Sequence, residues 1–332
     1  MDTTLLILGV VIILALAFDF INGFHDTANS IATSVSTRAL TPRRAILLAA
    51  SMNFLGAIAF TGVAKTIGGK IADPSTMDNG LEVIIATLLA AIIWNLVTWY
   101  FGIPSSSSHA LIGALVGAVF VGAGSDHVKW GGFTEIVEAL LMSPIIAFIV
   151  GYIVMTVLKF IFANRSPHTV NKGFRTLQIL TAALQSFTHG TNDAQKAMGI
   201  ITFALVTSGE LSDLTVPLWV KIFAAASMAL GTSVGGWKII KTMGTKIFKI
   251  EPINGFAADI SSASVIFSAT LLHLPVSTTH AITPAILGVG AAKRFSAVRW
   301  SLAGRIVMTW FITIPISAVL AGLLYKLLFG WS

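Results

Sequence analysis

Residues 5–29 read LLILGVVIILALAFDFINGFHDTAN, an apolar run that passes directly into a polar and charged stretch. A helix needs about 20 mainly apolar residues to cross the hydrocarbon core of a bilayer. Asp26 would then lie at membrane depth, where an ionised side chain costs about 2.5–3.5 kcal/mol and is functional by default. The stretch therefore predicts a membrane helix that carries part of a polar site.

The composition of the whole chain agrees with a bilayer as its solvent. The chain has 332 residues, of which 55% are hydrophobic and 11% are charged, and its mean hydropathy is +0.86. Because folded proteins in water need a polar surface, this composition argues against a soluble enzyme, a secreted domain and a disordered protein. Cysteine is absent, which excludes a disulfide framework. We expect an all-α polytopic protein with about ten to twelve membrane segments.

The net charge of +7 raises the question of a nucleic-acid partner. The basic residues, however, lie in short loops between apolar runs, which is typical of cytoplasmic loops. We therefore expect a multi-pass protein of the cell (inner) membrane with no nucleic-acid partner. The leading residues MDTT carry no basic charge. The first run is thus predicted to be an uncleaved helix, although the ALA stretch at 15–17 resembles a signal-peptide cleavage site.

Self-similarity divides the chain into two halves. Five short stretches recur in the same order at offsets of 167 to 176 residues, which predicts a duplication with halves at 1–160 and 165–332. The pairs are FINGFHDTAN (20–29) with FTHGTNDAQK (187–196), AASM (49–52) with AASM (225–228), KTIGGKI (65–71) with KTMGTKI (241–247), NG (79–80) with NG (254–255), and PSSSSHA (104–110) with PVSTTHA (275–281).

The charges of equivalent loops indicate that the two halves are inverted. Arg38, Arg43 and Arg44 give the first loop a charge of +3, whereas its counterpart carries Glu210 and Asp213. The other two pairs of loops also differ in the direction expected for opposite sides of the membrane. Both termini are then outside, and each half crosses an odd number of times. Inverted repeats are typical of secondary transporters, in which both halves form one central site.

The first repeated polar motif is suited to a small cation. In each half a glycine precedes an aspartate, which predicts that the membrane helices break near Gly23 and Gly190. Carboxylate and amide oxygens beside freed backbone carbonyls would form a cage of hard ligands; the alternative is a structural kink capped by the aspartate. The candidate cation ligands are Asp26, Asn29, Asn192, Asp193 and Gln195.

The second repeated motif is suited to an oxyanion. Each copy has a proline, then hydroxyl residues, then a histidine and an apolar run, which predicts a hairpin tip followed by a helix start. Helix N-termini and hydroxyl groups bind anions, although N-capping alone is the alternative interpretation. The candidate anion-binding residues are Ser105, Ser106, Ser107, Ser108, Ser277, Thr278 and Thr279, together with Thr27 and Lys196 from the first motif.

The charges of these motifs predict coupling between cation and anion. Asp26 and Asp193 with a divalent oxyanion would carry −4, of which Lys196 offsets only one charge. A net negative charge of this size in a low-dielectric interior requires bound cations. A site in which anion binding depends on bound cations is typical of a symporter. His25, His109 and His280 are either hydrogen-bonding partners or proton-coupling groups.

Catalytic patterns are absent. Adjacent residues on a helix do not face each other, so Ser108 with His109, and Thr279 with His280, are not nucleophile–base pairs. We therefore expect no enzyme, although an intramembrane hydrolase and a channel remain alternatives.

These motifs resemble those of the inorganic phosphate transporter (PiT) family, whose members move phosphate with Na⁺ or H⁺. The family pattern Gly-Ala-Asn-Asp-Val-Ala-Asn is similar to residues 23–29 and 190–196, and its Pro-[Ile/Val]-Ser-x-Thr-His element is similar to 104–109 and 275–280. The resemblance covers nearly the whole chain. His25, Gln195 and Lys196 depart from the animal form and look like the prokaryotic branch. The resemblance implies phosphate as substrate, a polytopic fold with inverted repeats and a homodimer. The family's Asp and Asn positions carry over to Asp26, Asn29, Asn192 and Asp193.

We therefore expect a sodium-coupled phosphate symporter that works by alternating access, with sodium as the coupling ion and no other cofactor. The alternatives are a proton-coupled carrier of phosphate or metal–phosphate and, less favoured, a permease for sulfate or another oxyanion. An ionised aspartate beside the anion would accept the hydrogen that divalent phosphate keeps and would reject sulfate.

Overall fold

The computed structural model describes residues 3–73, 76–77, 79–234 and 236–330, which form α-helices and short helical turns without a named β-strand. The all-α expectation is confirmed. The helices are α1 (Thr3–Ser36), α2 (Pro42–Ala59), α3 (Gly62–Lys70), α4 (Gly80–Phe101), α5 (Ser107–Gly122), α6 (Trp130–Ile161), α7 (Pro167–Thr207), α8 (Leu218–Val234), α9 (Trp237–Lys241), α10 (Pro252–Leu271), α11 (Thr278–Arg294) and α12 (Trp300–Phe329).

The helices have the lengths and surfaces of a membrane bundle. Within the described residues, α1, α4, α6 and α12 are each long and apolar enough to cross a bilayer, and two bent pairs bring the number of candidate spans to six. Large apolar side chains point outward, among them Ile13, Phe160 and Leu327 at 68%, 85% and 80% exposed. The count is lower than ten to twelve because α7 is long but polar, while the other helices are short or polar.

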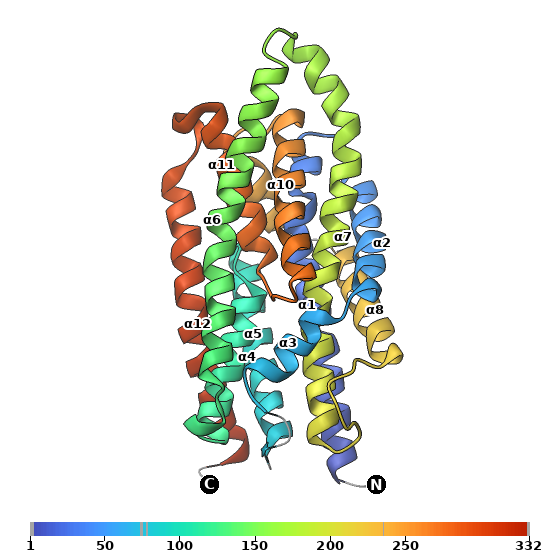
Figure 1. Ribbon diagram of the computed structural model, residues 1–332, viewed down its shortest axis with the longest axis vertical. Coiled ribbons are helices and arrows are strands. Elements are labelled where there is room, and N and C mark those ends of the chain that lie inside the picture. Colours follow the sequence, from blue (N-terminus) through green and yellow to red (C-terminus); the bar gives the residue numbers. More distant parts are fainter. Residues whose placement is uncertain (1–2, 74–75, 78, 235, 331–332) are drawn as a thin grey trace.

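The order of elements in the second half follows that in the first. Long α1 and α7 are each followed by a bent pair, α2 with α3 at 68° and α8 with residues 239–246 at 69°. The halves also interlock, since α5 packs on α12 and α6 packs on α11. Both termini lie at one end of the bundle, and the α6–α7 connection lies at the other (Figure 1).

The expectation of helix breaks near Gly23 and Gly190 is wrong. Both α1 and α7 run through these positions without interruption. A Cβ on Gly23 would collide with the backbone oxygen of Met228 on α8, and one on Gly190 with that of Asn53 on α2. The two glycines therefore serve close helix crossings between the halves, and the bends lie in the following helix pairs instead.

Replacing Gly23 with alanine should destabilise the protein by about 1–3 kcal/mol, because the added methyl group overpacks the crossing of α1 and α8. The measurement is the thermal unfolding midpoint of the purified protein in detergent. Gly9→Ala on the same helix is the matched control, since a Cβ there meets nothing within 4 Å. Equal midpoints for the two variants would contradict the close-crossing role.

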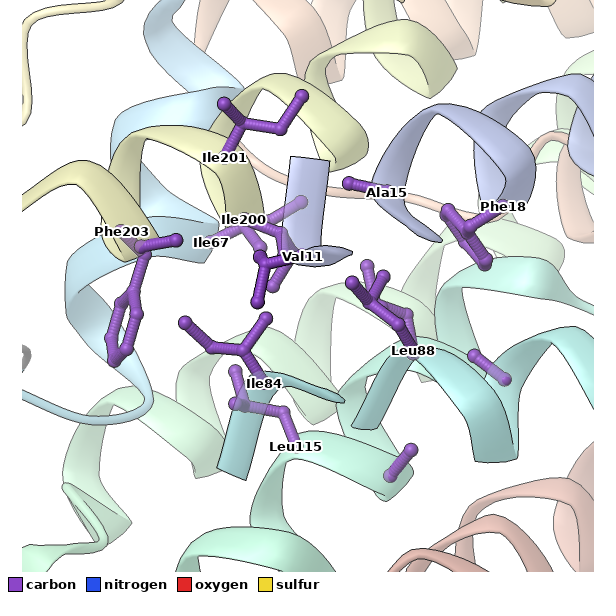
Figure 2. Packing of buried hydrophobic residues seen from close by; sticks show 14 of the residues in the cluster. Val11, Ala15, Phe18, Ile67, Ile84, Leu88, Leu115, Ile200, Ile201 and Phe203 are labelled. Atoms are coloured by element: carbon purple, nitrogen blue, oxygen red, sulfur yellow. The ribbon is translucent and has the colours of Figure 1, made fainter. Parts of the chain in front are cut away.

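Two clusters of apolar side chains flank the centre of the bundle. The first cluster joins the N-terminal half of α1 to α4, α5 and the last part of α7. Figure 2 shows Val11, Ile84 and Ile200 converging there. The second joins the following part of α1, around Ile31, to α2, α10 and α11. The polar residues of the first repeated motif lie between the two clusters along α1 and α7, and those whose side chains are described are buried.

Candidate functional site

The four polar segments predicted from the sequence meet at the centre of the bundle. Asp26 comes from α1, Asp193 comes from α7, and the starts of α5 and α11 face each other. The Ser108 hydroxyl donates to the Val276 carbonyl at 2.9 Å, and the rings of His109 and His280 have centroids 4.3 Å apart. The two hairpin tips therefore touch.

Asp26 links α1 to both hairpin tips. Its Oδ2 accepts a hydrogen bond from the Ser107 hydroxyl at 2.6 Å, and its Oδ1 accepts one from Thr279 at 3.4 Å. His25 Nδ1 lies 2.6 Å from the same Oδ1, and His25 Nε2 lies 3.0 Å from the Thr98 hydroxyl. Asp26 is 1% exposed, so these neighbours replace water around a buried carboxylate.

Asp193 is held by an ammonium group as well as by hydroxyl and amide donors. Its Oδ1 lies 2.9 Å from Lys196 Nζ, and its Oδ2 accepts hydrogen bonds from Thr278 at 3.2 Å and Asn22 at 3.4 Å. Lys196 Nζ also donates to the Ser107 hydroxyl at 3.1 Å. Ser107 thus connects the two aspartates, and the predicted residues of both halves form one polar centre.

The predicted amide ligands divide into two groups. Asn29 donates to Thr279 at 2.7 Å, and its Oδ1 has no hydrogen-bond partner among the described residues. The oxygens of Asn192 and Gln195, in contrast, accept backbone N–H groups of Val276 at 3.3 Å and Ala64 at 3.0 Å. Asn192 and Gln195 therefore position a hairpin and the start of α3, and their cation role stays a prediction.

The predicted hydroxyl groups also differ in their tasks. Ser106 and Ser277 cap α5 and α11, each accepting the backbone N–H three residues later. Ser105 donates to Thr98 at 2.8 Å. Thr27 lies on α1, but its side chain is outside the described part of the chain. The hydroxyls directed at the carboxylates are those of Ser107 and of Thr278 and Thr279.

The three histidines lie beside this centre. His109 Nδ1 is 2.8 Å from the Ser106 hydroxyl. The His280 ring packs against the Trp310 ring at a tilt of 35° and a centroid distance of 3.9 Å, and the Trp310 indole N–H donates to the Pro104 carbonyl at 3.3 Å. Of the three, only His25 is paired with one of the predicted site aspartates.

Sequence reasoning missed several buried ionisable groups. His189 Nε2 lies 3.4 Å from Asp193, and Asp259 on α10 accepts hydrogen bonds from Thr33 at 2.7 Å and Thr181 at 3.2 Å. Asp19 on α1 is 0% exposed. The signal for Asp19 was an acidic residue at the end of the first apolar run, seven positions before Asp26.

The donor atoms of the centre suit a hard cation and an oxyanion. Across the described ranges, no group of three or more His, Cys, Asp or Glu side chains is arranged to hold a metal ion. The centre instead offers carboxylate and amide oxygens for a hard cation, and hydroxyl and ammonium donors for an anion.

A bundle that exposes apolar side chains and buries carboxylates, an ammonium group and amides at its centre defines a multi-pass membrane transport protein. The sequence profile of the phosphate transporter family matches residues 22–321. The chain therefore belongs to this family, and it is a transporter of phosphate rather than an enzyme.

Named relatives and a solved structure agree with this assignment. The chain is 59% identical to a probable low-affinity inorganic phosphate transporter of Bacillus subtilis, over 99% of both chains. It is 50% identical to a protein of the same description from Rhizobium meliloti, over 98% of both chains. A solved structure, described as that of a sodium-dependent phosphate transporter, superposes with a TM-score of 0.87 at 26% identity, covering 97% of this chain and 98% of the other.

Proposed function

We propose that the protein is a sodium-coupled symporter of inorganic phosphate that works by alternating access at this centre. The observation that carries the proposal is that the anion-binding donors are directed at the cation-binding carboxylates. Ser107 donates to Asp26, Thr278 donates to Asp193, and Lys196 lies between Asp193 and Ser107. The transporter of similar solved structure is sodium-dependent, which supports Na⁺ as the coupling ion.

This arrangement makes phosphate binding depend on cations. Sodium at Asp26 and Asp193 satisfies the carboxylates and releases the hydroxyl groups and the Lys196 ammonium, which then donate to phosphate oxygens. Without sodium, phosphate must compete with two ionised carboxylates for the same donors. It must also enter beside their negative charge in a low-dielectric centre. Each ligand therefore strengthens the binding of the other by the same factor.

The surroundings of the centre support alternating access. The site side chains are buried, and an apolar cluster lies to either side of them along α1 and α7. We infer that residues 1–160 and 165–332 are inverted repeats and that motion of the site-bearing helices opens one cluster at a time. The α6–α7 connection lies at the end of the bundle opposite to both termini, which supports an odd number of crossings in each half and therefore the inversion. A cell-membrane location with both termini outside, and a homodimer, belong to the same proposal.

Labelled phosphate uptake into proteoliposomes that contain only this protein tests the proposal. A sodium gradient is compared with a proton gradient, each with and without excess sulfate. We expect accumulation on the sodium gradient alone, with little competition by sulfate. Accumulation on the proton gradient alone would contradict sodium coupling. It would assign the coupling role to groups that can bind a proton, such as His25, whose Nδ1 lies 2.6 Å from Asp26 Oδ1.

A further inference from the structure

Asp19 is a buried carboxylate that the polar centre does not use. Its side chain is on α1 and is 0% exposed, and neither of its carboxylate oxygens has a hydrogen-bond partner among the described residues. Asp26, Asp193 and Asp259, by comparison, each accept hydrogen bonds from side chains. A buried carboxylate without partners is very unfavourable in its ionised form, so Asp19 holds either a proton or a cation.

Two buried amides offer further free oxygens near Asp19. Asn22 lies one turn after Asp19 on α1, and its Oδ1 is unpartnered; on α4, Asn95 has neither side-chain atom hydrogen-bonded within the described residues. The contact of His25 with Thr98 at 3.0 Å sets the register of α1 against α4. Asn22 and Asn95 lie three residues before these two contacts, so they occupy the same level on the facing stripes of the two helices.

The free atoms are mostly acceptors. Asp19 contributes two oxygens and Asn22 and Asn95 contribute one each, against one amide donor group on Asn95. A set of buried oxygens that includes one carboxylate attracts a small, hard cation. The negative charge of Asp193 also acts on Asp19, which adds to the attraction, whereas Lys196 partly offsets it.

We propose that Asp19, Asn22 and Asn95 form a further sodium site, separate from the cation ligands of the two repeated motifs. Seven residues of helix separate Asp19 from Asp26, or about 10 Å along α1, towards the end of the bundle where the termini lie. A sodium ion at this site would be linked to the polar centre through Asn22, because the Asn22 amide also donates to Asp193 at 3.4 Å. The ion would therefore help to hold Asp193 in place.

The charge of the centre supports a further cation. Asp19, Asp26 and Asp193 with Lys196 carry a net charge of −2 when the histidines are neutral, and divalent phosphate brings the sum to −4. Two sodium ions leave a net charge of −2 in the low-dielectric interior, and a third sodium ion reduces it to −1. The inference rests on the proposed function in taking Na⁺ as the coupling ion.

Equilibrium binding of ²²Na⁺ to the purified protein, without phosphate and in potassium buffer, tests the site directly. We expect Asp19→Asn to lower the number of sodium ions bound per chain by one. Asn95→Leu removes one ligand oxygen at similar volume and should weaken one class of sodium site about tenfold. This second variant keeps the test decisive if Asp19→Asn does not fold. Ser317→Ala, which removes a buried and unpartnered hydroxyl on α12, should leave sodium binding unchanged.

Unchanged sodium stoichiometry and affinity in both site variants would overturn the proposal. Unchanged sodium binding with fewer protons moved per phosphate in Asp19→Asn would also overturn it, because Asp19 would then hold a proton. Failure of the proposed function looks different, since wild-type phosphate uptake would not depend on sodium at all. The binding experiment uses no phosphate and therefore separates the two failures.

Discussion

Replacing Lys196 with methionine should reduce phosphate uptake about a hundredfold or more, the loss expected when one member of a buried charge pair is truncated. Lys196 is 1% exposed and lies 2.9 Å from Asp193 and 3.1 Å from Ser107. Its removal withdraws the ammonium donor from the proposed phosphate site. It also leaves Asp193 buried without its charge partner, which costs about 3–5 kcal/mol of stability.

The double variant Asp193→Asn with Lys196→Met separates these two effects. It removes both charges, so its thermal unfolding midpoint in detergent should return most of the way to that of the wild type. Its phosphate uptake into proteoliposomes should stay as low as in Lys196→Met. Recovery of uptake together with stability would show that Lys196 serves only to neutralise Asp193.

The overall class and the convergence of the candidate site residues could be predicted because repeated polar motifs stand out in an apolar chain. Asp26 and Asp193 each follow a glycine within long apolar surroundings, and the structure brings both to the hairpin tips around Ser107 and Thr278. Duplication gives the same signal twice, which single-residue patterns do not. The position of the polar centre therefore followed from sequence alone.

The local roles could not be predicted, because they depend on packing between distant segments. Gly23 and Gly190 were interpreted as helix breakers, yet each allows two backbones to approach, which only the partner helix reveals. Neighbouring hydroxyls also diverge, since Ser106 caps α5 while Ser107 points at Asp26. Which serine caps the helix and which one contacts the aspartate depends on the residue at which α5 begins. A run of four serines does not determine that residue.

Asp19 shows a further limit of the sequence. It has no equivalent acid at the matching position of the second half, where Ser186 stands. A search for repeated features therefore passes over it. Its meaning depends on the absence of partners among the described residues and on Asn95, which comes from a helix more than seventy residues later.

Replacing Asp26 with asparagine should raise the sodium concentration for half-maximal phosphate uptake about 10- to 100-fold, which corresponds to the loss of a charged contact worth about 1.5–3 kcal/mol. Asp26 is the carboxylate on which both hairpin tips converge, through Ser107 and Thr279. An asparagine keeps the shape but removes the charge that attracts sodium, and it turns an amide donor towards the hydroxyls. The measurement is uptake into proteoliposomes as a function of sodium concentration.

The control is Asp213→Asn, which neutralises an acid in the loop between α7 and α8 outside the polar centre and should leave the sodium dependence unchanged. Asp193→Asn is the informative comparison, because Lys196 lies beside Asp193 and would become free to donate to phosphate. Asp193→Asn should therefore weaken sodium dependence while retaining more phosphate affinity than Asp26→Asn. Wild-type sodium dependence in both site variants would remove the two aspartates from the cation site and leave their hydrogen bonds to the hairpin tips as their whole role.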